Sequence, residues 1–268
     1  LMNISTGRYV LYPFAIFATW IHETCHGIAA CLVGGKIDKL LIYSDGSGLA
    51  YTYSDGTNWK RAFIASAGYV GTALVGGMLL LCRRLRVGPT VGIIGIGLGM
   101  LLSCALVIRN QFGLLFVSLF GFTLCILGWK FKAGWVEQLF AIIAATCSLN
   151  AVDDIHNLFA PGMGYVGGEP RWSDAHTVAE KIGMTYKFWA TCWFIFAIIM
   201  TLLGIFFALE DRIKPEDTST TATTTSAHDL PSVNIYGNGN ATTAPPSQTS
   251  YAAYSQTSPP DATVVQVY

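Results

Sequence analysis

Residues 9–33 read YVLYPFAIFATWIHETCHGIAACLV, an apolar run that carries one compact polar motif, His-Glu-Thr-Cys-His at 22–26. The run is longer than the roughly 20 apolar residues that cross the ~30 Å hydrocarbon core of a bilayer as a helix. Ionisable side chains in the middle of such a segment are costly to insert and are functional by default. The segment is therefore both a predicted membrane span and a candidate site.

The rest of the chain also indicates a membrane protein. Of its 268 residues, 52% are hydrophobic and 12% are charged, whereas an ordinary soluble domain has about 25% charged residues. Basic and acidic residues balance at sixteen each, so no excess of positive charge indicates a nucleic-acid partner. Apolar runs long enough to span a bilayer are predicted in about six places: 9–33, 62–82, 90–108, 111–129, 136–159 and 186–208.

A polar break at Arg109, Asn110 and Gln111 leaves the number of spans at five or six. It is either a turn between two helices or an interruption of one long apolar stretch. Within the run 62–82, Gly68, Thr72 and Gly76 recur every four positions, a spacing typical of helices that pack closely in lipid. Lys and Arg residues in the short loops favour cytosolic termini.

Two segments depart from the apolar pattern. Residues 34–61 contain two β-prone runs around an Asp-Gly turn, which predicts a β-hairpin. Residues 215–268 are rich in Ser, Thr, Pro, Ala and Asn and contain no Lys or Arg, which predicts a disordered tail. The expected fold is an all-α polytopic membrane protein with about six transmembrane helices, in which a core at 1–214 carries the small hairpin insertion and precedes the disordered C-terminal tail.

The spacing within the motif is that of a metal site. His22 and His26 are four residues apart, so on a helix they lie one turn apart on the same face and can bind one metal ion through ring nitrogens. Glu23 lies about 100° around the helix axis from His22, near enough to contact a metal-bound water without being a ligand. This is the His-Glu-x-x-His arrangement of zinc metalloproteases. The alternative is a polar contact between helices, with the imidazoles hydrogen-bonded to neighbours.

A catalytic zinc site has three protein ligands and one open position for water. A third ligand is therefore expected from another membrane-embedded helix. The acidic residues deep in a later apolar run are Asp153 and Asp154, and one of them is expected to complete the site. Asn150 precedes Asp154 by one turn, where it could orient the carboxylate or bind a substrate carbonyl. The alternative is that this polar group marks the end of the helix.

Taken together, these segments resemble the site-2 protease family of intramembrane zinc metallopeptidases, and most closely its B-like subgroup. The resemblance covers about residues 9–208 and is carried by the motif at 22–26, the segment Asn150-Ala151-Val152-Asp153-Asp154-Ile155 and the later Ser173-Asp174-Ala175. Better-known members carry Asp-Gly at the third-ligand helix, where this chain has Asp154-Ile155. Ser173 is also the predicted N-cap of a short helix, with Asp174 at its positive end.

The resemblance implies Zn²⁺ bound by His22, His26 and Asp154, with Glu23 as the catalytic general base. It implies hydrolysis of peptide bonds in membrane-spanning or membrane-adjacent substrate proteins, so the expected partners are membrane proteins and the lipid bilayer. An edge of the predicted hairpin could hold an extended substrate by strand addition.

Two other classes of function stay open. A metal or proton transporter would use the motif and the aspartates as a relay, but it predicts polar residues spread along several spans, whereas here they gather in two places. A catalytically inactive relative would bind membrane proteins without cleaving them, and the intact Glu23 counts against it.

Overall fold

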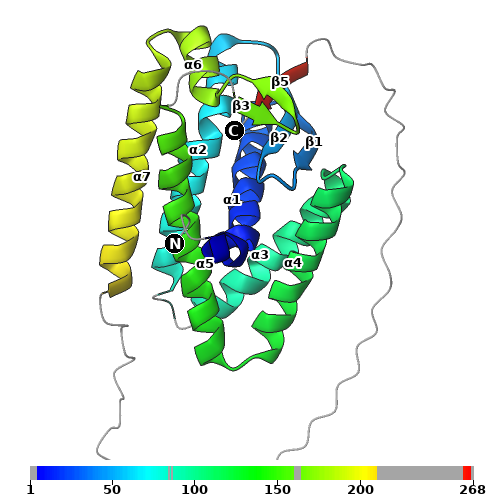
Figure 1. Cartoon of the computed structure of the whole chain (residues 1–268), viewed down its shortest axis with the longest axis vertical. Coiled ribbons are helices and arrows are strands. Elements are labelled where there is room, and N and C mark those ends of the chain that lie inside the picture. The colour runs from blue at the N-terminus through cyan, green and yellow to red at the C-terminus, as the bar shows by residue number, and fades with distance from the viewer. Residues whose placement is uncertain (1–4, 84, 86, 160–163, 210–261, 267–268) are drawn as a thin grey trace, which may run out of the picture. The chain divides into compact units, whose positions relative to one another are not determined.

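A computed structural model of the chain describes residues 5–83, 85, 87–159, 164–209 and 262–266, which all belong to one unit of the chain. The described residues are mostly helical (Figure 1). The helices are α1 (Ser5–Leu32), α2 (Asn58–Cys82), α3 (Gly88–Leu106), α4 (Gln111–Lys130), α5 (Ala133–Asn157), α6 (Asp174–Ile182) and α7 (Tyr186–Leu209). The strands are β1 (Lys36–Ile42), β2 (Gly48–Tyr53), β3 (Gly164–Val166), β4 (Glu169–Arg171) and β5 (Ala262–Gln266).

Five helices of the described chain, α2, α3, α4, α5 and α7, are long and apolar enough to cross a membrane. This number agrees with the predicted five or six spans. Helix α1 has 28 residues and carries the 22–26 motif; it is not among the five. The polar break near Arg109 is a turn that separates α3 from α4, so the two apolar runs around it are different helices.

Helix α2 packs against α1, α5, α6 and α7, and makes a smaller contact with α3. Its small residues permit these close contacts, as their regular spacing predicts. A Cβ atom added at Gly76 would lie 2.7 Å from Oγ of Ser148 on α5. Two clusters of buried apolar side chains fill the interior, and α2 contributes residues to both.

The predicted β-hairpin is confirmed as the antiparallel pair β1 and β2, which extends from Lys36 opposite Tyr53 to Ile42 opposite Gly48, with one shift of register between Ile37 and Lys39. Asp45 stabilises the turn by accepting hydrogen bonds from the backbone N–H (2.9 Å) and hydroxyl (2.6 Å) of Ser47. The turn is attached to α1, because the Thr19 hydroxyl donates to the carbonyl of Gly46 at 2.6 Å. The hairpin therefore lies over the helix that carries the 22–26 motif.

Both outer edges of this hairpin are paired. On the β1 side, the connection between α3 and α4 binds Leu40: its N–H donates to the carbonyl of Val107 at 2.9 Å, and its carbonyl accepts from the N–H of Arg109 at 3.2 Å. The side chain of Asn110 accepts from the N–H of Ile42 at 3.1 Å and donates to its carbonyl at 2.5 Å. On the β2 side lies β5, which gives the strand order β1-β2-β5.

Strand β5 falls within the segment 215–268, for which disorder is the prediction. Most of that segment lies outside the described residues, but 262–266 form an antiparallel strand on β2. A second short hairpin, β3 and β4, also arises where the apolar pattern gave no strand signal. Its two-residue turn is formed by Gly167 and Gly168, whose φ angles of 58° and 87° suit the turns that join antiparallel strands tightly.

Candidate metal centre

The two histidines of the motif lie on the inner face of α1, as their spacing predicts. Their ring centroids are 4.7 Å apart, and their exposed fractions are 3% for His22 and 0% for His26. The ring of Tyr69 on α2 packs edge-on against His22 at 4.5 Å, and Tyr69 is in turn stacked on Trp193 of α7 at 5.3 Å. Two aromatic side chains from other helices thus fix the position of the first imidazole.

A backbone carbonyl orients the second imidazole. Nδ1 of His26 lies 2.7 Å from the carbonyl oxygen of Ile64 on α2. Because a carbonyl only accepts, Nδ1 carries the hydrogen and Nε2 presents its lone pair to the interior of the site. Metal-binding histidines commonly donate their other ring N–H in this way, which fixes both the tautomer and the ring orientation.

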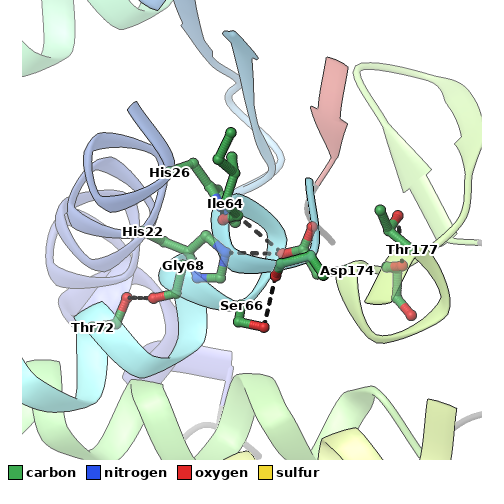
Figure 2. Close-up of polar contacts among 10 residues, drawn as sticks. His22, His26, Ile64, Ser66, Gly68, Thr72, Asp174 and Thr177 are labelled. Atoms are coloured by element: carbon green, nitrogen blue, oxygen red, sulfur yellow. Dashed lines mark hydrogen bonds and ion pairs between the residues drawn. The ribbon is translucent and has the colours of Figure 1, made fainter. Parts of the chain in front are cut away.

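The carboxylate at the histidines is that of Asp174, the first residue of α6. Its Oδ2 lies 3.5 Å from Nε2 of His22 and 3.2 Å from Nε2 of His26, and Asp174 is fully buried. Figure 2 shows the three side chains converging from α1 and α6. The possible ligand atoms all lie within 4.8 Å of one another. Tetrahedral zinc with bonds of ~2.0–2.1 Å separates its ligand atoms by about 3.4 Å, so the two measured distances suit a shared metal ion.

Local packing of α6 delivers this carboxylate. Ala175 and Val178 are buried in the same apolar cluster as Ile64 and Ala65 of α2, which holds the start of α6 against the site. As the first residue of the helix, Asp174 is also stabilised by the positive end of the helix dipole. Ser173 occupies the N-cap position, as predicted, although its hydroxyl makes no capping hydrogen bond to the helix backbone.

The Ser173 hydroxyl instead lies 2.9 Å from Nδ1 of His176. The ring of His176 is stacked against that of Tyr186 of α7, with 4.1 Å between the ring centroids, and its centroid lies 4.8 Å from that of Trp172. Partial burial lowers the pKa of the His176 imidazole, which favours the neutral ring in this aromatic setting. This side chain supports the start of α6 and is not one of the three possible ligands.

Asp154, the third ligand chosen from the sequence, is not placed at the histidines. It lies in the last turn of α5 and is half-buried, while Asp153 is exposed. Within the part of the chain that the structure describes, the group of possible metal ligands contains neither of them. Asp174 lies on α6, a short amphipathic helix that packs against α2 and is not an apolar run. On this geometry, Asp174 replaces Asp154 as the candidate third ligand.

Glu23 lies beside this group and under the hairpin. It is fully buried, and a Cβ added at Gly48, the first residue of β2, would lie 2.6 Å from its Oε1. Glycine at the start of β2 therefore leaves space for the carboxylate of Glu23. The arrangement brings together one acid-base group, three possible ligands and the backbone of a strand.

The donor atoms of the site fit a metal ion. Within the described ranges, Nε2 of both histidines and the carboxylate oxygens of Glu23 and Asp174 are buried without a hydrogen-bond partner. Burial of such groups without hydrogen-bond partners is costly, and a cation held between the Nε2 atoms and Oδ2 of Asp174, which lie 3.2–3.5 Å apart, would offset that cost. Two imidazoles and one carboxylate are a ligand set that catalytic zinc sites use.

Comparisons with known proteins bear on this site. A family model described as Peptidase M50B-like matches residues 1–204. The matched segment contains the motif on α1, the hairpin and Asp174. Comparisons with curated proteins and with solved structures found no match.

Proposed function

Since the chain belongs to the Peptidase M50B-like family, we propose that it is a zinc metalloprotease that hydrolyses peptide bonds of membrane-spanning or membrane-adjacent proteins. The observation that carries the proposal is the buried group of His22, His26 and Asp174 beside Glu23. We propose further that the protein is a multi-pass integral membrane protein, which its five long apolar helices support.

In this proposal, Nε2 of His22, Nε2 of His26 and the carboxylate of Asp174 hold Zn²⁺. The ion, when bound, lowers the pKa of a water ligand to near 7 and polarises the scissile carbonyl. The carbonyl of Ile64 keeps the His26 ring in the tautomer that can coordinate. With these three protein ligands, the site would keep one position for water, as a catalytic zinc site requires.

Glu23 supplies the acid-base chemistry. Its carboxylate accepts a proton from the attacking water and then delivers that proton to the nitrogen of the leaving amine, so the peptide C–N bond breaks without a net change in protonation of the enzyme. As the residue after His22 it is turned away from the ligand face of α1, which makes it a base rather than a fourth ligand. Its burial keeps the transferred proton away from bulk solvent.

The substrate must be extended at the site of cleavage. Carbonyls in a transmembrane helix are hydrogen-bonded within the helix and are shielded from attack. Strand β2 begins at Gly48, against Glu23, so a substrate segment that pairs with β2 would pass close to the catalytic carboxylate. Strand addition of this kind supplies main-chain hydrogen bonds in place of those lost when the helix unwinds.

Metal removal tests the proposal. We expect the purified protein in lipid to contain close to one zinc ion per chain, to lose cleavage of a panel of membrane-spanning substrates on chelation, and to regain it when zinc is added back. Cleavage that survives complete removal of zinc would contradict the mechanism. Zinc-dependent transport of metal or protons without any cleavage would favour the transporter.

A further inference from the structure

The second edge of β2 is covered by a segment from far along the same chain. Residues 262–266 pair antiparallel with β2, from Ala262 opposite Tyr53 to Gln266 opposite Leu49. This β5 segment also contacts α2, the helix that supplies Ile64 and Gly68 to the metal centre. Its sequence, Ala-Thr-Val-Val-Gln, is rich in the β-branched residues that favour strands.

The hairpin has no other edge at which a strand can add. The outer edge of β1 is bound to the connection between α3 and α4 through Leu40 and through the side chain of Asn110. Ala50 in the middle of β2 has Leu40 opposite it on one side and Val265 on the other. An extended substrate can therefore pair with β2 only where β5 now lies.

We propose that residues 262–266 are an intramolecular occupant of the substrate-binding edge of β2, and that an extended substrate segment must displace them to reach Glu23. This inference rests on the proposed function for its consequence, but the occupancy itself does not. Backbone groups at one edge of a strand pair with one neighbour at a time. Bound β5 and bound substrate are consequently exclusive, and the chain carries its own competitor of cleavage.

Peptide binding tests the occupancy without any need for proteolysis. The probe is a labelled peptide with the sequence of residues 261–268, DATVVQVY, added to two proteins that both carry Glu23→Gln. We expect it to bind the protein that lacks residues 261–268 and to bind the full chain several-fold more weakly. Equal binding to both proteins, or binding to neither, would overturn the proposal.

A second variant, of full length, controls for misfolding of the truncated protein. Alternate residues of an edge strand turn their N–H groups toward the partner strand, so proline at both 264 and 265 removes at least one donor of the ladder. The full chain with Val264→Pro and Val265→Pro should bind the labelled peptide as the truncated protein does. A peptide with the same two prolines should bind neither protein.

Cross-linking tests the register. Tyr51 and Val264 lie opposite each other, and paired strands bring such Cα atoms to about 4.5–5.5 Å, within the range of a disulfide. Tyr51→Cys with Val264→Cys should yield the corresponding disulfide-linked peptides on mass-spectrometric mapping. Lys39 lies opposite Tyr51 on the far strand, so Lys39→Cys with Val264→Cys is the matched control and should not cross-link. A cross-link in the control but not in the test pair would overturn the proposal.

Cleavage assays separate this inference from the proposed function. With Glu23 intact, the protein lacking 261–268 should cleave a membrane substrate several-fold faster than the full chain, and added DATVVQVY peptide should slow it again. Equal rates for the two active proteins would overturn the competition. If neither protein cleaves any substrate, the proposed protease function fails, while the binding and cross-linking results still decide whether β5 occupies the edge.

Discussion

Gly68 of α2 stands directly against His22 of α1, with no space for a side chain between them. A Cβ atom at position 68 would overlap Nε2 of His22 and would lie 2.5 Å from Nε2 of His26. The absence of a side chain at position 68 of α2 therefore leaves the two Nε2 atoms free to face Asp174.

Gly68→Ala should consequently displace the imidazoles and reduce zinc content sharply. Alanine is the better helix former by about 1 kcal/mol, so α2 itself should persist, but the displaced imidazoles and the lost ion should lower the melting temperature. Zinc per chain and thermal unfolding are the two measurements. Gly95→Ala is the matched control, because a Cβ there meets nothing within 4 Å, and it should keep its zinc. Full zinc occupancy in Gly68→Ala would show that the nitrogens do not point where the structure places them.

Asp174→Ala should cost metal affinity and activity together. Loss of an outer partner of a ligand costs about 10–100-fold in metal affinity, and loss of a direct ligand should cost more. Asp154→Ala is the comparison, because Asp154 lies outside the group of possible ligands and should spare most of the zinc. Titration with a zinc chelator measures the metal affinity of both variants. If only Asp154→Ala loses metal, the assignment made from the sequence is right and the geometric one is not.

Glu23→Gln should leave zinc bound but slow proteolysis by about 10²–10⁴-fold, the contribution of a general acid-base group. The amide keeps the size of the side chain but does not accept the proton. Glu180→Gln on the exposed face of α6 is the control and should cleave normally. Loss of zinc from Glu23→Gln would instead make this residue a ligand.

Asn110→Ala should loosen the hairpin from the turn between α3 and α4. Its side chain bonds both the N–H and the carbonyl of Ile42, and leaving such partly buried groups unpaired costs about 1–3 kcal/mol. The expected result is a lower melting temperature in detergent, with zinc retained. Gln111→Ala, at an exposed neighbouring position, should melt like the unchanged protein. Equal melting of the two variants would mean that Asn110 does not stabilise the hairpin.

Local patterns in the sequence predicted what depends on local geometry. The four-residue spacing of His22 and His26 fixed their common face, the Asp-Gly turn predicted the hairpin, and the lengths of apolar runs predicted the long helices. These features follow from helix period, turn chemistry and bilayer thickness, all of which act within one segment.

Such local patterns do not predict contacts between segments that are distant in the sequence. Asp174 reaches the histidines because Ala175 and Val178 bury against α2, and no periodicity states which helix a short amphipathic segment will cover. Ser173-Asp174-Ala175 belongs to the family resemblance, but Asp174 lies outside the apolar runs of the sequence, so hydropathy does not mark it as a ligand. Residues 262–266 form a strand because β2 offers an edge, which their own polar surroundings in the sequence do not reveal.

The polar motif of α1 has a consequence for how the protein is made. The translocon inserts a segment into the bilayer according to its insertion free energy. Each charged residue at the centre of a helix raises that free energy by about 2.5–3.5 kcal/mol. Since α1 carries His22, Glu23 and His26 within its apolar run, we expect it to enter the bilayer with α2, as a helical pair. An insertion assay on α1 alone should show poor integration, and joining α2 should rescue it. Efficient integration of isolated α1 would refute this order of assembly, in which α2 shields the two histidines and Glu23 from lipid as the chain is synthesised.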